Sequence, residues 1–209
     1  MTRGLAFSAS YSLSKAIDDA SDPGATTYET NLPQAVRNMA AERALASFDH
    51  RHRFTGNFTY ALPTGWQVSG IVTLQSGAPF SVMLGTDRAN IGSGPVQRPN
   101  VSGDPNALAN PTATLWFDTS VFSLPAPYTF GNAGRNSVLA PGYADLDVGI
   151  HKEIALATGT KLSLRWEVFN LLNRVNFDVP NRIAFTPNFG RIFSAQPARQ
   201  MQIGARMTF

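Results

Sequence analysis

The chain has 209 residues, enough for one domain with a sizeable core, so its length alone excludes no fold class. Apolar residues make up 43% of it but charged residues only 15%, well below the roughly 25% that is usual for soluble globular domains. No run approaches the roughly 18 consecutive apolar residues of a membrane-spanning helix, which excludes a helical membrane protein and leaves a membrane β-barrel open.

The charge distribution argues against a nucleic-acid partner, and the lack of cysteine excludes chemistry that needs a thiol. The net charge is +3, but the basic residues are scattered singly apart from Arg51 and Arg53, so we expect no nucleic-acid partner. Zero cysteines exclude disulfides, thiolate catalysis and cysteine-ligated metals.

Six segments alternate apolar and polar residues with the two-residue period of strands that have two different faces. In chain order they span residues 5–14, 53–62, 66–75, 144–154, 161–168 and 200–209. Most are about 10 residues long, which exceeds the usual strand and matches a tilted crossing of a bilayer. Ile71 and Lys152 break the alternation, and we expect Lys152 to snorkel to the membrane interface from a strand end.

Short and long connections alternate strictly between these segments. Pro63-Thr64-Gly65 and Ala157-Thr158-Gly159 are tight hairpin turns, whereas residues 15–50, 77–142 and 173–198 form long connections. Outer-membrane barrels have this asymmetry, with short periplasmic turns and long extracellular loops. The sequence therefore predicts an all-β, antiparallel transmembrane barrel segment in the outer membrane.

The last segment alternates most strictly and fixes the expected orientation. Its C-terminal end should be periplasmic, and Tyr60, Trp66 and Phe209 should contribute to an aromatic girdle at that edge of the bilayer. One face of the segment consists of Met201, Ile203, Ala205, Met207 and Phe209.

The long connections are polar and rich in turn residues, but they also contain a candidate helix and several aromatic side chains. Residues 34–47 favour one short helix. Trp116, Phe117, Phe122 and Tyr128 are loop aromatics that can stack on a sugar, contact a peptide or bury one another.

A water-soluble β-sandwich that serves as a binding module is the main structural alternative, because it also alternates apolar and polar residues. Its strands would be shorter and less uniform. Loops of about 30 and 65 residues are also uncommon in compact soluble domains. The barrel is therefore favoured.

The search for catalytic chemistry finds little, and we expect no enzyme, no cofactor and no metal. His50 and His52 have the spacing of two metal ligands on one strand face, but no third ligand is placed near them, so ordinary polar residues at a loop junction are the preferred reading. No nucleotide-binding or serine-hydrolase motif is present.

A row of charged residues follows one face of residues 144–154, and a carboxylate site is one interpretation of it. In a barrel that face is the wet lumen, so a hydrated wall paired with Lys161 and Arg165 on the next strand is the preferred interpretation. The row consists of Asp145, Asp147, His151 and Glu153.

Four segments together resemble the TonB-dependent receptors. Residues 169–173, Phe-Asn-Leu-Leu-Asn, resemble the segment that closes their penultimate strand, and residues 75–80, Gln-Ser-Gly-Ala-Pro-Phe, resemble a strand end. Residues 48–54 resemble the entry into a barrel strand, and the terminal Phe209 resembles their assembly signal. The run around residues 189–200 is similar to the Oar-like branch, which has an N-terminal carboxypeptidase-regulatory-like domain.

This resemblance implies a barrel of roughly 22 strands around a plug, of which residues 1–209 supply about the last six. We expect a fragment, since the chain contains no plug, TonB box or signal peptide. The implied partners are outer-membrane lipid, the TonB complex acting through the plug, an unknown ligand such as a siderophore, oligosaccharide or peptide, and the barrel-assembly machinery. That machinery would read Met201, Ile203, Ala205, Met207 and Phe209. A passive porin and a surface adhesion or export barrel remain alternatives.

Overall fold

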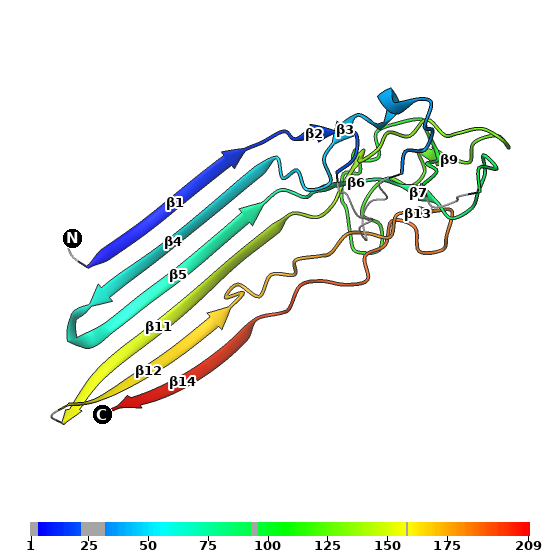
Figure 1. Cartoon of the computed structure of the whole chain (residues 1–209). Coiled ribbons are helices and arrows are strands. Elements are labelled where there is room, and N and C mark those ends of the chain that lie inside the picture. The colour runs from blue at the N-terminus through cyan, green and yellow to red at the C-terminus, as the bar shows by residue number, and fades with distance from the viewer. Residues whose placement is uncertain (1–3, 22–31, 93–95, 158) are drawn as a thin grey trace.

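The computed structural model describes residues 4–21, 32–92, 96–157 and 159–209. Six long strands form one antiparallel sheet whose spatial order, β1-β4-β5-β11-β12-β14, follows the chain (Figure 1). They are β1 (Leu5–Leu13), β4 (His52–Leu62), β5 (Trp66–Gln75), β11 (Tyr143–Ala157), β12 (Thr160–Phe169) and β14 (Gln200–Thr208). Every predicted strand is confirmed, and the largest difference is that β11 continues beyond Ile154 to Ala157.

The register gives the sheet two chemically different faces. On one face, directly paired residues form a mainly apolar row that runs across all six strands. The neighbouring rows on that face are also mainly apolar. This row consists of Phe7, Phe58, Gly70, Val148, Val168 and Met201. The alternate rows are polar with few exceptions, among them Ile71, as the sequence predicts.

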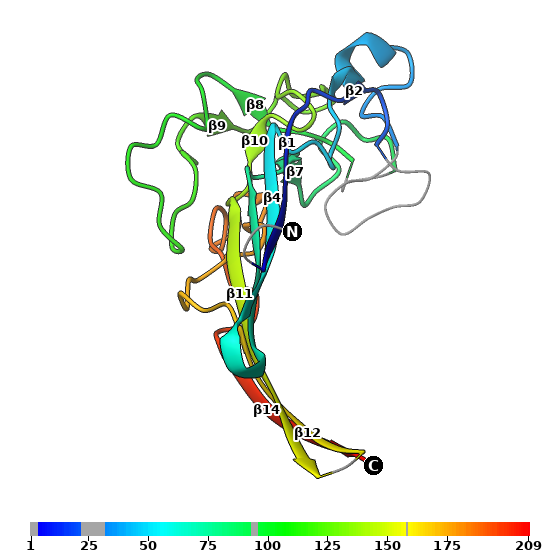
Figure 2. The same ribbon diagram turned by 90° about the vertical axis from the view of Figure 1, so that its left-hand side faces the viewer.

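The sheet is a single curved layer, seen edge-on in Figure 2. Many of its apolar side chains are exposed, most strongly on the edge strands, with Phe7 at 77% and Ile203 at 83%. A water-soluble β-sandwich buries such a face under a second sheet. Here the long connections gather at one end of the strands and leave the face open (Figure 1), so the sandwich alternative is wrong.

The short turns lie at the opposite end from the long connections. The turn between β4 and β5 is the 3-10 turn η2 (Pro63–Gly65), in which Thr64 and Gly65 have positive φ angles of 64° and 80°. In the turn between β11 and β12, Gly159 has a φ of 83°, and Thr158 lies outside the described residues. Both predicted hairpins are therefore present.

The short helix predicted over residues 34–47 is wrong. Only one 3-10 turn, η1 (Met39–Glu42), forms there, and β3 (Ala44–Leu45) pairs with β2 (Ile17–Asp18) directly after it. The Glu42 carboxylate accepts the backbone N–H of Gln34 at 3.1 Å, so tertiary contacts override the local helix preference. Within the described residues, no helix is long and apolar enough to cross a membrane.

The three long connections interlock into one folded unit, which we call the cap and define as the described residues of 14–51, 76–142 and 170–199. Short strand pairs tie its parts together. They are β6 (Pro79–Phe80) with β10 (Val138–Leu139), β8 (Asn100–Val101) with β9 (Phe122–Ser123), and the parallel pair β7 (Met83–Leu84) with β13 (Ile183–Ala184).

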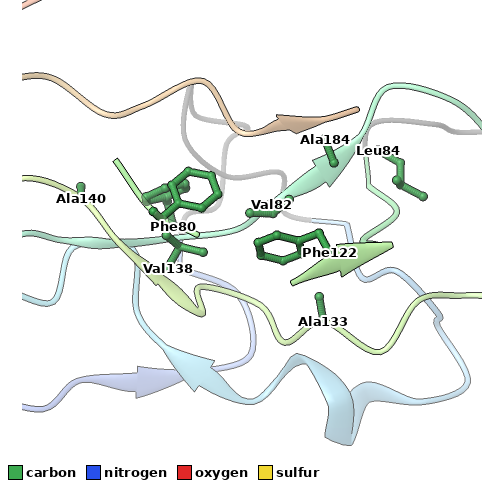
Figure 3. Close-up of a cluster of buried hydrophobic side chains, with 9 residues drawn as sticks. Phe80, Val82, Leu84, Phe122, Ala133, Val138, Ala140 and Ala184 are labelled. Carbon is green, nitrogen blue, oxygen red and sulfur yellow. The ribbon is translucent and has the colours of Figure 1, made fainter. Parts of the chain in front are cut away.

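The cap has its own hydrophobic core (Figure 3). The ring of Phe117 lies edge-on to Phe80, Phe122 and Phe189, with centroids 5.8, 6.1 and 5.2 Å away. Phe189 comes from the third connection and the other three rings from the second, so this cluster joins two separate loops. Burying each such ring contributes about 1.5–3 kcal/mol.

Candidate functional site

The apolar face of the sheet has aromatic side chains at both ends. Tyr60, Trp66 and Trp166 lie near the short turns, while Tyr11 and Phe54 lie near the cap. Six residue steps separate Phe54 from Tyr60 on β4, or about 20 Å at a strand's rise of roughly 3.3 Å per residue. At the tilt of about 40° that is usual for barrel strands, this separation spans about 15 Å across the bilayer, which lies within the apolar band of about 25 Å that aromatic girdles bound.

Lys152 is the one charged residue in the rows of this face that the register aligns. Its ammonium lies 5.0 Å from the centroid of the Trp66 ring and donates a hydrogen bond to the carbonyl of Thr64 in the η2 turn. The long side chain thus reaches the end of the strand, as predicted from its position.

Both edges of the sheet are open. β1 pairs only with β4 and β14 only with β12 among the described residues. Unpaired strand edges are template surfaces that proteins normally cover or close. A barrel closes them by adding further strands on both sides.

The opposite face of the sheet is polar along its length. Near the cap, Asp147 accepts the backbone N–H of Asn170 at 2.9 Å, and Asp145 accepts the hydroxyl of Tyr143 at 3.1 Å. Near the short turns, Lys161 and Glu153 form an ion pair at 2.9 Å. The predicted pairing of Lys161 with the charged row is confirmed, whereas Arg165 forms no ion pair with the described residues.

Residues 48–54, one of the segments that resemble the receptor family, lie where β4 leaves the cap. Asp49 is buried, and its carboxylate accepts the hydroxyl of Ser14 at 2.9 Å and the backbone N–H of Ala16 at 3.0 Å. The ring of His50 bonds the carbonyl of Ser76 at 2.7 Å. These contacts hold the ends of β1, β4 and β5 together at the rim of the sheet.

Residues 169–173, the receptor-like segment with two asparagines, end β12 at the same rim. Asn170 and Asn173 both have left-handed φ angles, 51° and 50°, which asparagine tolerates better than most residues. The side chain of Asn170 accepts the backbone N–H of Arg174 and donates to its carbonyl, both at 2.9 Å. The motif therefore makes the chain turn away from the sheet into the cap.

Gly77 belongs to residues 75–80, another receptor-like segment. Its backbone packs directly against the backbone of Ala140 and Pro141. A Cβ at this position would lie 1.7 Å from the carbonyl oxygen of Ala140 and 3.1 Å from that of Pro141. No side chain can rotate away to relieve that overlap. Only glycine fits at this point of the rim.

We expect Gly77→Ala to destabilise the rim by about 1–3 kcal/mol, because the two segments must separate to admit the methyl group. Gly204→Ala on β14 is the matched control, since an added Cβ there meets no heavy atom within 4 Å. Urea titration of the folded protein in detergent measures the difference. Equal stability of the two variants would contradict the close packing.

The cap contains a buried ionic network that joins the first two connections. Arg98 and Glu42 form two parallel hydrogen bonds of 2.7 and 2.9 Å, with the two residues only 3% and 1% exposed. Arg135 donates to the Glu42 carbonyl at 2.7 Å and pairs with Asp18. Gln34 accepts the Arg98 backbone N–H at 2.6 Å and donates to the Gly131 carbonyl at 2.9 Å.

Two carboxylates, one exposed and one half-buried, shape turns of the cap. The backbone N–H of Ile91 and the amide of Gln97 are the main donors that hold the pKa of Asp87 below its ordinary value. The hydroxyl and N–H of Ser120 do the same for the pKa of Asp118. Both carboxylates are therefore charged near neutral pH and order their own turns.

A pocket of about 510 Å³ lies between the cap and the polar face of the sheet. That volume is within the range of small-molecule sites. The side chains of Asp178 and Gln196 hydrogen bond to each other at 2.7 Å on the cap side. Its lining combines polar and aromatic groups, including His50, Gln75, Phe80, Tyr143, Phe177, Asp178 and Gln196. Sequence reasoning missed this pocket, because its lining residues come from segments far apart in the chain.

Residues 1–202 match the family described as "Outer membrane beta barrel domain". The chain belongs to this family. Its place is accordingly the outer membrane, where the apolar face of the sheet meets lipid and the polar face turns to the barrel interior. Neither the curated proteins nor the solved structures include a match to it.

The last strand continues the apolar face of the sheet. Met201, Ile203 and Met207 are all more than half exposed on the apolar face, with Ala205 between them. Phe209 follows the end of β14 and is 96% exposed. Their role as an assembly signal stays a prediction.

The two candidate histidines bind separate partners in this barrel segment. His50 contacts the Ser76 carbonyl, whereas the ring of His52 bonds the hydroxyl of Tyr11 at 2.8 Å. In the described ranges, no group of three or more His, Asp or Glu side chains is placed to hold a metal ion.

The four loop aromatics divide into buried and exposed residues. Phe117 and Phe122 belong to the cap core, and the indole of Trp116 donates to the Leu139 carbonyl at 2.9 Å. Tyr128 is 78% exposed. Of the four, Tyr128 is therefore the one most available to a ligand outside the barrel.

Proposed function

We propose that the chain is the C-terminal part of the barrel of a TonB-dependent receptor of the Oar-like branch, which takes up a ligand across the outer membrane. The complete barrel would have roughly 22 strands around a plug. The TonB complex would act through that plug, which lies outside this sequence. The residues described here would bind and guide the ligand without a catalytic step.

The observation that carries this proposal is the arrangement at the rim. Three of the segments that resemble the receptor family lie where strands enter or leave the cap: Asp49 with His50, Gly77 in its backbone contact, and Asn170 with its turn. Each side chain or backbone contact there holds a long connection in place. Motifs with such specific anchoring favour a common architecture over chance similarity.

The pocket under the cap supports a role in ligand capture. It is open to the polar face of the sheet and is lined by His50, Tyr143 and Asp178 among others. Aromatic and hydrogen-bonding groups together suit polar organic ligands. A siderophore, an oligosaccharide or a peptide would each find suitable contacts, and the proposal includes all three classes.

Assembly would depend on the last strand. We propose that the barrel-assembly machinery reads the exposed apolar row Met201, Ile203, Ala205, Met207 and Phe209. The open edge of β14 would then pair with the first strand of the complete barrel.

The test uses the natural full-length protein in its own host, with and without TonB. Uptake is measured for three labelled probes: a ferric hydroxamate siderophore, a malto-oligosaccharide and an oligopeptide. We expect uptake of one probe to stop when the receptor is deleted, when TonB is deleted or when a protonophore is added.

The alternatives give different results in the same experiment. A passive porin would continue to take up the probe without TonB and with the protonophore. An adhesion or export barrel would change surface attachment or secretion, while uptake of every probe stays unchanged. Either result would contradict the receptor proposal.

A further inference from the structure

Two arginines and a histidine from three neighbouring strands line one hollow on the polar face, near the short turns. Arg165 on β12 lies directly across from His151 on β11, and also across from Gly204 on β14. Arg206 is two residues beyond Gly204, so it is the diagonal neighbour of Arg165 on the same face. All three side chains reach a hollow of about 410 Å³.

The two guanidinium groups carry more positive charge than the hollow balances, because Glu167 is the one acidic residue among the described residues that line it. Neither Arg165 nor Arg206 has a hydrogen bond or an ion pair with any residue that the structure describes. Glu153 pairs with Lys161, and Glu167 accepts a hydrogen bond from Gln202 but forms no ion pair with either arginine. The Glu167 charge offsets one of the two guanidinium charges and leaves the other for an anion. Like charges side by side on a sheet destabilise it unless something neutralises them.

The floor of the hollow leaves room for a guest. Gly149 lines the hollow without a side chain. Gly204, the partner of Arg165 on β14, also leaves open space beside it, since a Cβ there would meet no heavy atom within 4 Å. Ser69, Ser163 and Gln67 add small hydrogen-bonding groups to the lining. Large side chains on this part of the sheet would have filled the space above Arg165.

We propose that this hollow binds the oxyanion of a small anionic solute, a carboxylate or a phosphate, on the inner wall of the barrel. Arginine presents planar N–H pairs that match the oxygens of both groups. His151 and the serine hydroxyls supply further donors at the edge of the anion. The site requires only the barrel, so it holds for a receptor and for a porin alike.

Calorimetric titration of the full-length protein in detergent with sodium phosphate, at constant ionic strength, tests the site. We expect saturable binding to the wild type, weakened at least about tenfold by Arg165→Gln and by Arg206→Gln, because each removes a charge-assisted contact. Arg53→Gln is the matched control. It removes an arginine from the same face near the cap, and phosphate affinity should change less than about twofold.

The result is interpretable only for folded protein, so each variant is checked for an unchanged thermal midpoint. Equal weakening by Arg53→Gln would reduce the effect to general charge and overturn the proposal. Absence of saturable phosphate binding, with a thermal midpoint lowered by Arg165→Gln and Arg206→Gln, would also overturn it. That result would mean that the two arginines stabilise the folded protein through contacts within it and do not bind a solute.

Discussion

Replacing Arg98 by methionine should open the cap while the six-stranded sheet stays folded. The change leaves the Glu42 carboxylate buried at 1% exposure without its arginine partner, although the backbone N–H of Gln34 still donates to it. Removing one partner from such a pair costs about 3–5 kcal/mol, because the other charge stays out of water. Hydrogen exchange of the cap amides should therefore speed up by about two to four orders of magnitude.

Two further variants separate the buried charge from other effects. Arg43→Met removes an exposed arginine next to Glu42 and should leave exchange unchanged. The double variant Glu42→Gln, Arg98→Met removes the buried charge but keeps an acceptor for Gln34, so it should recover part of the loss. If Arg98→Met and Arg43→Met exchange at the same rate, the ion pair does not hold the cap together.

The consequence for function is that the long connections act as one body. Arg98 belongs to the second connection and Glu42 to the first, while the Phe189 ring of the third packs against Phe117 of the second. A ligand that binds any one connection would therefore meet a surface stiffened by the others. This coupling makes the cap a defined wall for the pocket beneath it.

The sheet was predictable from the sequence because its information is local. Alternation with period two marks each strand, and breaker residues such as Pro63 and Gly159 mark the turns. The same alternation predicted the two faces, and the register confirms them through rows such as Phe58, Gly70 and Val148. Lys152 shows that even an exception can be interpreted from its distance to the strand end.

The cap was not predictable, because its contacts join residues far apart in the chain. Gln34 donates to the carbonyl of Gly131, 97 residues away, and the strand pairs of the cap are only two residues long. Glu42 and Arg98 look in the sequence like ordinary charged loop residues. The pocket beneath the cap and the hollow beside Arg165 share this origin, since each combines side chains that only the folded sheet brings together.

Replacing Val148 by arginine should destabilise the barrel strongly, whereas Gln202→Arg should have little effect. Val148 lies in the middle row of the apolar face, between Gly70 and Val168. An arginine facing lipid at the bilayer midplane costs about 2–4 kcal/mol. Gln202 lies on the polar face, where an added charge stays in water. Urea titration of the full-length protein folded into lipid vesicles measures both free energies of unfolding.

Leu164→Arg adds a test of depth on the same face. Leu164 lies in the row of Lys152, next to the short turns, and should cost less than Val148 because the arginine can reach the interface. The natural Lys152 already does so, with its ammonium over Trp66. The expected order of destabilisation is Val148→Arg, then Leu164→Arg, then Gln202→Arg. Equal losses for Val148→Arg and Gln202→Arg would mean that the two faces share one environment, which contradicts a lipid-facing and a lumen-facing side.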